Sequence, residues 1–70
     1  MSEDARIAFG QQVKEARERL SITQEQLAEK AGGIHQAYIS HIERGTYNTR
    51  IDTMAAIAVA LGLNLIINLE

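Results

Sequence analysis

The chain has 70 residues, of which 46% are hydrophobic, and a formal net charge of −2. These values fit one small globular domain and argue against disorder. The absence of cysteine excludes disulfides and thiolate metal sites. The longest apolar run, residues 54–61, is far shorter than the roughly 20 residues that span a bilayer. Because the first residues are acidic where a signal peptide would be basic, we expect a cytoplasmic protein.

Apolar residues at helical spacing predict a first helix over about residues 4–20. Its inward stripe consists of Phe9, Val13, Ala16 and Leu20. A second helix is expected from residue 24 to about residue 31. Its start is indicated by a capping box between Thr23 and Gln26 and by a hydrophobic staple between Ile22 and Leu27. Gly32 follows and can adopt the left-handed conformation that ends a helix.

Two further helices are predicted beyond this turn. The third covers about residues 36–44, with Ile39 and Ile42 facing inward. The fourth covers about residues 50–61, and Thr49 and Asp52, three residues apart, form its expected start signal. A glycine directly follows each of these two helices, as is typical of helix ends.

The C-terminal residues change from a helical period to a period of two, which is typical of a β-strand. The alternating apolar positions are Leu63, Leu65, Ile67 and Leu69. Because a lone strand leaves its backbone groups unpaired, we expect it to pair with the same strand of a second copy. Residues 1–62 would then form the globular domain and residues 63–70 a dimerisation strand. The alternative is an extended segment that folds back over its own helices.

The sequence offers little for catalysis. Its only histidines, His35 and His41, do not have the spacing of a metal site, and no glycine-rich loop follows a strand. Seventy residues would also hardly enclose a substrate pocket. We therefore expect a protein that is not an enzyme and that uses no metal or cofactor.

Two motifs carry a resemblance to a known family. Residues 24–28 read Q-E-Q-L-A and residues 39–45 read I-S-H-I-E-R-G, and together they resemble the helix-turn-helix of the Xre/Cro family. The resemblance implies an all-α, lambda-repressor-like domain of four helices, here followed by a short C-terminal β-strand that pairs across a homodimer. It further implies a sequence-specific repressor that binds a pseudo-palindromic DNA operator in the nucleoid.

The C-terminal strand is similar to that of HipB-like antitoxins, so the preferred subtype is an autoregulating antitoxin with a toxin partner. A phage repressor or a restriction–modification controller remains open. The rival interpretation is a protein-binding or toxin-neutralising adaptor that keeps the fold without reading DNA. It is motivated by the acidic pI and by the altered cap at His35, one of two departures from the family. The turn after residue 31 is one residue longer than usual, and His35 replaces the usual Ser or Thr cap.

In the family, the helix after this turn enters the major groove. The resemblance therefore implies that the base contacts come from Gln36, Ala37, Ser40 and His41. It implies that the DNA phosphates are held by Thr23, Gln24, His35, Tyr38, Arg44, Tyr47, Asn48 and Arg50. It also implies an ion pair between Arg17 and Glu43 that ties the first helix to the recognition helix. For each of these side chains, the alternative is an ordinary solvated or packed residue.

Overall fold

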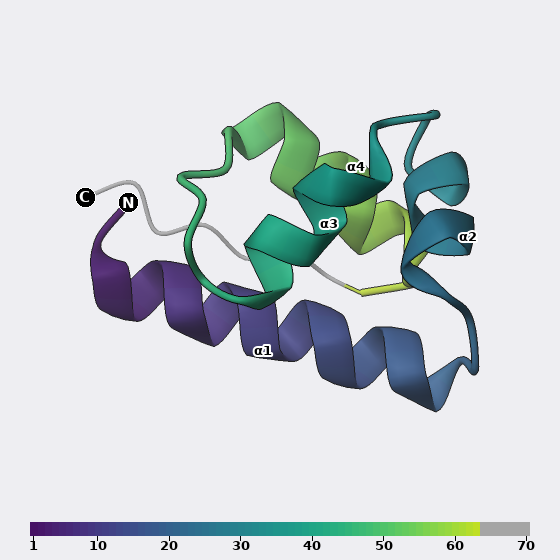
Figure 1. Ribbon diagram of the computed structural model, residues 1–70, viewed down its shortest axis with the longest axis horizontal. Coiled ribbons are helices and arrows are strands. Elements are labelled where there is room, and N and C mark those ends of the chain that lie inside the picture. Colours follow the sequence, from purple (N-terminus) through teal and green to yellow (C-terminus); the bar gives the residue numbers. More distant parts are fainter. Residues whose placement is uncertain (64–70) are drawn as a thin grey trace.

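The computed structural model describes residues 1–63, which contain four helices. They are α1 (Glu3–Arg19), α2 (Gln24–Lys30), α3 (Gln36–Glu43) and α4 (Ile51–Ala60). Figure 1 shows α1 lying along one side of the molecule, with α3 packed over it and α2 at the end where α1 finishes. The predicted all-α, four-helix class is confirmed, and each helix lies within one residue of its expected bounds. Within residues 1–63, no helix is long and apolar enough to cross a membrane.

All four helices contribute to one hydrophobic core. Four side chains at its centre are fully buried, namely Val13, Leu27, Ile39 and Ile57. The inward direction predicted for Ile39 is therefore confirmed, as it is for Ile42, which is 1% exposed. Leu20 departs from its predicted stripe. It is 50% exposed because it is the C-cap of α1, where the chain already leaves the helix.

Gly10 lets α1 and α3 approach each other closely. A Cβ atom at this position would collide with the carbonyl oxygen of Ile42 in α3. The same side of α1 holds the loop that follows α3, because Arg6 Nε donates to the Gly45 carbonyl oxygen at 3.4 Å. The first helix thus supports both α3 and its exit, as the ribbon in Figure 1 shows.

The start of α4 differs from its prediction. The helix begins at Ile51 with Arg50 as its N-cap, and no side chain makes a capping hydrogen bond there. Thr49 was expected to cap this helix, but it is 7% exposed and its hydroxyl has no partner within residues 1–63. The Thr49–Asp52 signal therefore predicts the helix correctly, but the capping contact that it implies is wrong, because the threonine side chain is buried and Arg50 is the N-cap.

The predicted C-terminal strand lies almost wholly outside the described residues. This applies to Leu65, Ile67 and Leu69, and with them to the pairing across a dimer. Leu63 is described: it is partly buried and packs against the core, and its amide donates to the Ala58 carbonyl oxygen at 2.8 Å.

Candidate nucleic-acid interface

The start of α2 is fixed by the capping box that the sequence predicts. The backbone N–H of Gln26 donates to Thr23 Oγ1 at 3.0 Å, and the backbone N–H of Thr23 donates to the side-chain oxygen Gln26 Oε1 at 2.8 Å. Ile22 packs against the core that contains Leu27, where the predicted staple places it. Since such reciprocal bonds satisfy two amides that a helix start leaves free, the entry into the helix-turn-helix is well defined.

Two consecutive glycines absorb the additional residue of the turn. Gly32 and Gly33 have φ values of 103° and 80°, which side chains rarely adopt. This conformation brings the amides of Gly33 and Ile34 to the same acceptor, the Ala28 carbonyl oxygen, at 3.0 and 3.2 Å. The longer turn therefore closes tightly, and α3 still begins at Gln36.

His35 replaces the usual hydroxyl cap of α3 by a ring nitrogen. Its Nδ1 accepts a hydrogen bond from the Ala37 amide at 3.4 Å. This bond is long, but it satisfies one of the amides that a helix start leaves free. The imidazole of His35 thus caps the start of α3, as the Ser or Thr usual at this position would.

The outer face of α3 holds the side chains that were predicted to read bases. Gln36, Ala37 and His41 are exposed, whereas Ser40 is half-buried. Their inward neighbours are core residues, so this face can meet a partner without unfolding of the helix. Ser40 is the least accessible of the predicted base-reading residues.

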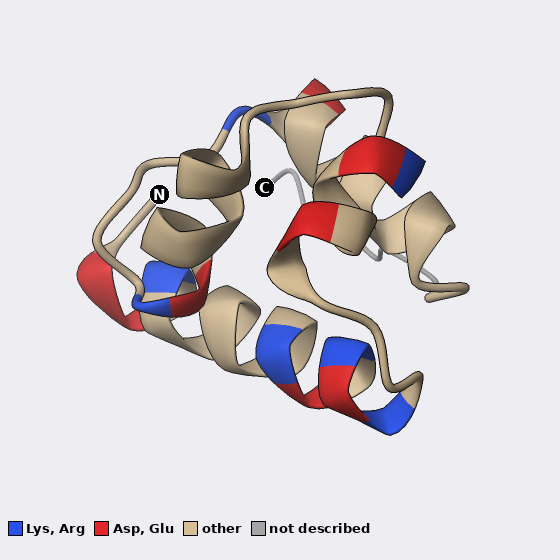
Figure 2. Ribbon diagram, turned by 45° about the vertical axis from the view of Figure 1, so that its right-hand side comes forward, with Lys and Arg blue, Asp and Glu red and all other residues tan. Residues whose placement is uncertain are grey.

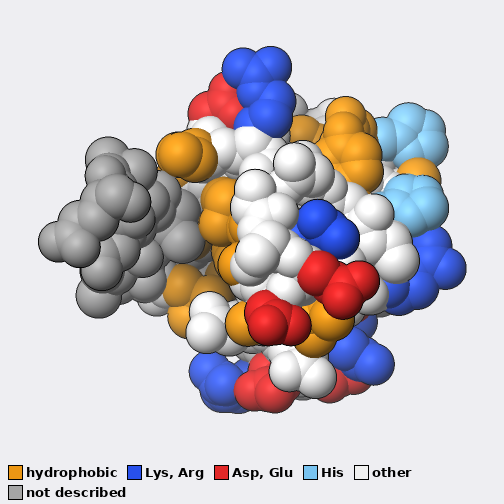
Figure 3. Space-filling model, turned by 90° about the vertical axis from the view of Figure 1, so that its left-hand side faces the viewer, with side chains coloured by type: hydrophobic (Ala, Val, Ile, Leu, Met, Phe, Trp, Pro, Cys, Tyr) orange, Lys and Arg blue, Asp and Glu red, His pale blue; other side chains and the backbone are white. Residues whose placement is uncertain are grey.

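A hollow of about 330 Å³ opens beside this face. It is lined by His35, Ala37, Tyr38, His41 and Tyr47, and Figure 3 shows the two histidines at this edge of the surface. Tyr38 and Tyr47 form an edge-to-face pair with ring centroids 4.8 Å apart. The Tyr47 hydroxyl donates to the Tyr38 hydroxyl at 2.9 Å, and this bond raises the pKa of Tyr47 above its ordinary value. Within residues 1–63, the Tyr38 O–H has no acceptor and can donate to a partner.

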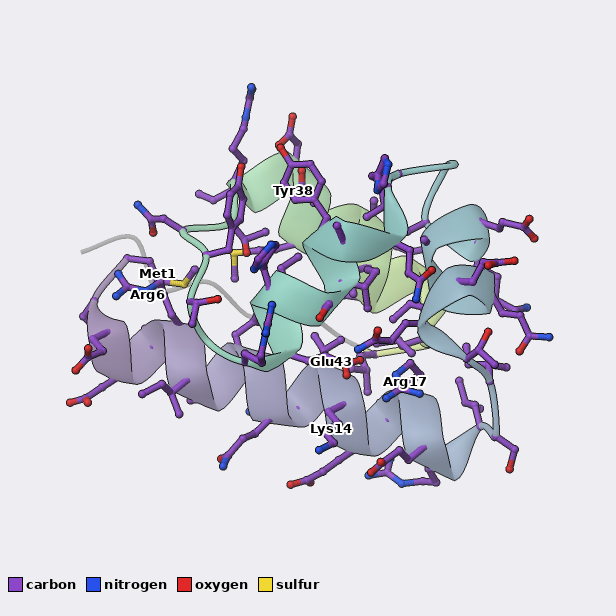
Figure 4. All side chains as sticks on the ribbon, viewed as in Figure 1. Met1, Arg6, Lys14, Arg17, Tyr38 and Glu43 are labelled. Carbon is purple, nitrogen blue, oxygen red and sulfur yellow. The ribbon has the colours of Figure 1, made fainter. Side chains whose placement is uncertain are left out.

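Beneath this surface, Glu43 joins three helices. Arg17 Nε lies 2.6 Å from Glu43 Oε2, and Arg17 Nη2 donates to Glu43 Oε1 at 3.1 Å. This is the pairing that the family resemblance implies, and the two labelled side chains meet between α1 and α3 in Figure 4. The hydrogen bond to Glu43 raises the pKa of Arg17. Glu43 is the last residue of α3, and its side chain is only 4% exposed, so the carboxylate of this pair is buried.

Gln24 completes this network, a role that its position in the sequence does not predict. Its Nε2 donates to Glu43 Oε1 at 3.1 Å, which connects the start of α2 to the end of α3. One N–H of the Gln24 amide is thereby committed inside the molecule, and the other remains for a partner. Gln24 and Glu43 are 19 positions apart in the chain, and no local sequence pattern relates them.

The charged groups around α3 are few and partly paired. Arg44 Nη2 lies 3.1 Å from His41 Nδ1, and Arg50 Nε lies 3.4 Å from Asp52 Oδ1 in an exposed ion pair. Figure 2 shows charges of both signs along α1. The face of α3 is therefore only mildly basic.

The side chains predicted to hold phosphates are mostly exposed. Those exposed to solvent are Thr23, His35, Tyr38, Arg44, Tyr47, Asn48 and Arg50, and Gln24 is half-buried. The described part of the chain has no group of three or more His, Cys, Asp or Glu residues that could hold a metal ion.

A family model described as helix-turn-helix matches residues 13–67 of this chain. The immunity repressor protein of Bacillus phage phi105 is 43% identical over 57 residues, which cover 81% of this chain and 39% of the repressor. Control protein C.BamHI of Bacillus amyloliquefaciens is 41% identical over 64 residues, covering 90% and 78% of the two chains. The crystal structure of the restriction–modification controller protein C.AhdI from Aeromonas hydrophila superposes with a TM-score of 0.80 at 30% identity. This superposition covers 87% of this chain and 91% of C.AhdI. Of the phage repressor, by contrast, this chain spans well under half of the length.

Proposed function

The chain belongs to the helix-turn-helix family of Xre and lambda-repressor-like proteins, and we propose that it is a sequence-specific DNA-binding transcriptional repressor. The observation that carries this proposal is the outer face of α3, where Gln36, Ala37 and His41 are exposed on a helix whose other side is core. A repressor protein and two control proteins among the similar chains support the same class of function.

In this proposal, α3 enters the major groove with its first turn against the base edges. Gln36 can form a bidentate pair with adenine, and Ala37 can contact a thymine methyl group. His41 lies one turn further along the same face, and Ser40 contributes only where the groove approaches the half-buried side of α3.

The DNA backbone would be held from both sides of α3. Gln24 and the capped start of α2 offer donors on one side, and Tyr38, Tyr47, Asn48 and Arg50 on the other. Since few free cations face the groove, each copy neutralises few phosphates. Affinity per copy is then modest and still weakens with salt, because each neutralised phosphate releases counterions.

We further propose that two copies bind a pseudo-palindromic operator together. The two most exposed large hydrophobic side chains of residues 1–63, Val59 (79%) and Ile51 (56%), both lie on α4, which we propose contacts the second copy. Residues 63–70 would extend this contact, and half-sites would lie about one helical turn apart. We expect a chain without residues 63–70 to sediment as a monomer; a dimer would show that these residues are not needed for association.

The similar proteins favour a regulator of the phage-repressor or controller kind. The antitoxin subtype, with its toxin partner, depends only on the apolar alternation of residues 63–69. We therefore place it second among the repressor subtypes.

The test is a selection of binding sites from a randomised duplex library, followed by titration of the selected duplex at two salt concentrations. We expect enrichment of a two-fold-related site and a steep loss of affinity with salt. Gln36→Ala should weaken binding by about 5- to 160-fold, the equivalent of about 1–3 kcal/mol for a bidentate base contact. Gln12→Ala, an exposed glutamine on the side of α1 away from α3, is the matched control and should bind normally. A library without enrichment would instead favour the adaptor interpretation.

A further inference from the structure

Both histidines of the recognition surface use the same ring nitrogen for a contact within the protein. His35 Nδ1 faces the Ala37 amide at 3.4 Å, and His41 Nδ1 faces Arg44 Nη2 at 3.1 Å. A backbone amide and a guanidinium can only donate, since neither has an acceptor on its nitrogen. In both contacts, therefore, the imidazole Nδ1 must be the acceptor.

This assignment fixes the form of each ring. A neutral imidazole whose Nδ1 accepts carries its proton on Nε2, and a doubly protonated ring could not accept at all. Within residues 1–63, Nε2 of neither histidine makes a hydrogen bond. Each ring therefore has one N–H donor available for a partner, and both side chains line the same hollow.

We propose that His41, held by Arg44 in its Nε2–H form, is a specificity-determining residue that donates to N7 of a purine in the major groove. N7 is the acceptor that guanine and adenine share at this edge. Arg44 is then a positioning residue that acts through the His41 ring, in addition to any contact it makes with a phosphate. This inference rests on the proposed DNA binding and names the kind of base that one position of the site requires.

The role of Arg44 can be tested without DNA, by nitrogen-15 NMR of the histidine rings. At a pH where the ring is neutral, we expect the Nε2–H tautomer for His41 in the wild-type chain. Arg44→Met removes the donor to Nδ1, so the Nδ1–H form should become detectable. Arg50→Met, which removes an equal charge from an exposed pair with Asp52, should leave the His41 spectrum unchanged. An Nδ1–H ring in the wild type, or identical spectra for wild type and Arg44→Met, would overturn the positioning role.

The base contact is tested on the selected duplex with purines replaced one at a time by their 7-deaza analogues, which lack N7. Apart from the adenine that Gln36 is proposed to contact through N6 and N7, one replacement per half-site should weaken wild-type binding by about 5- to 10-fold, the value of about one hydrogen bond. The same replacement should not affect His41→Ala. Arg44→Met should lower the purine preference at this position, whereas a purely phosphate-binding arginine would weaken all sequences equally.

The two proposals fail in different ways. If the library shows no enrichment, the proposed function is refuted, and the base contact with it. If a site is enriched but no 7-deaza purine discriminates wild type from His41→Ala, only the contact of His41 is refuted.

Discussion

Replacing Glu43 by glutamine removes one charge from the junction of α1, α2 and α3 while keeping the size of the side chain. In the wild type, the carboxylate accepts from Arg17 Nε, Arg17 Nη2 and Gln24 Nε2. A glutamine amide would turn an N–H₂ group toward one of these donors and leave the Arg17 charge uncompensated. Breaking a buried pair in this way costs about 3–5 kcal/mol. We expect about 3 kcal/mol, because Arg17 is 15% exposed and keeps its bond to the Ile22 carbonyl oxygen.

That loss is large for a chain of this length, whose total stability we place at about 4–10 kcal/mol from typical values per residue. Urea unfolding followed by circular dichroism would measure it, with an unchanged m-value as the check on two-state behaviour. Arg50→Met is the control, since its pair with Asp52 is exposed at both ends and contributes less than about 1 kcal/mol. If Glu43→Gln lowered the free energy of unfolding by less than about 1 kcal/mol, the Arg17–Glu43 pair would not stabilise the fold as a buried ion pair does.

Two backbone positions give further predictions for the same assay. Gly10→Ala should destabilise the fold by about 2 kcal/mol or more, because the added methyl group meets the Ile42 carbonyl. A gain of about 1 kcal/mol, as helix propensity alone predicts, would contradict the close approach of α1 and α3. Ser21→Gly should stabilise by about 0.5–1 kcal/mol, because Ser21 has a φ of 56°. Ser21→Ala keeps this strain and should be nearly neutral; equal effects of the two substitutions would exclude strain as the cause.

Local patterns were sufficient to predict the four helices and the start of α2. Thr23 and Gln26 are three residues apart, so their capping box can be read directly from the sequence. The same rule failed at Thr49, because tertiary packing buries its side chain. Gly10 had a weak signal, a lone glycine inside a helical pattern. Only the structure, however, identifies the part of α3 that Gly10 approaches, the Ile42 carbonyl.

For the candidate interface, the family resemblance implied which side chains would contact DNA, but not which hydrogen bonds these side chains make within the protein. The contact of Gln24 with Glu43 joins residues that are distant in sequence. The forms of His35 and His41 depend on hydrogen bonds whose geometry no spacing rule contains. His35 departs from the family motif, and only the structure shows that its ring nitrogen replaces the usual hydroxyl as the cap.

The most direct measurement is the change in backbone amide NMR signals when the selected duplex is added to the nitrogen-15-labelled chain. If α3 occupies the major groove, the largest changes should fall on residues 36–41 and on the first turn of α2. Signals in the middle of α1, on the far side of the core, should move little. Changes concentrated on α1 or α4, with the α3 signals unaltered, would contradict the assignment of this helix as the element that reads DNA.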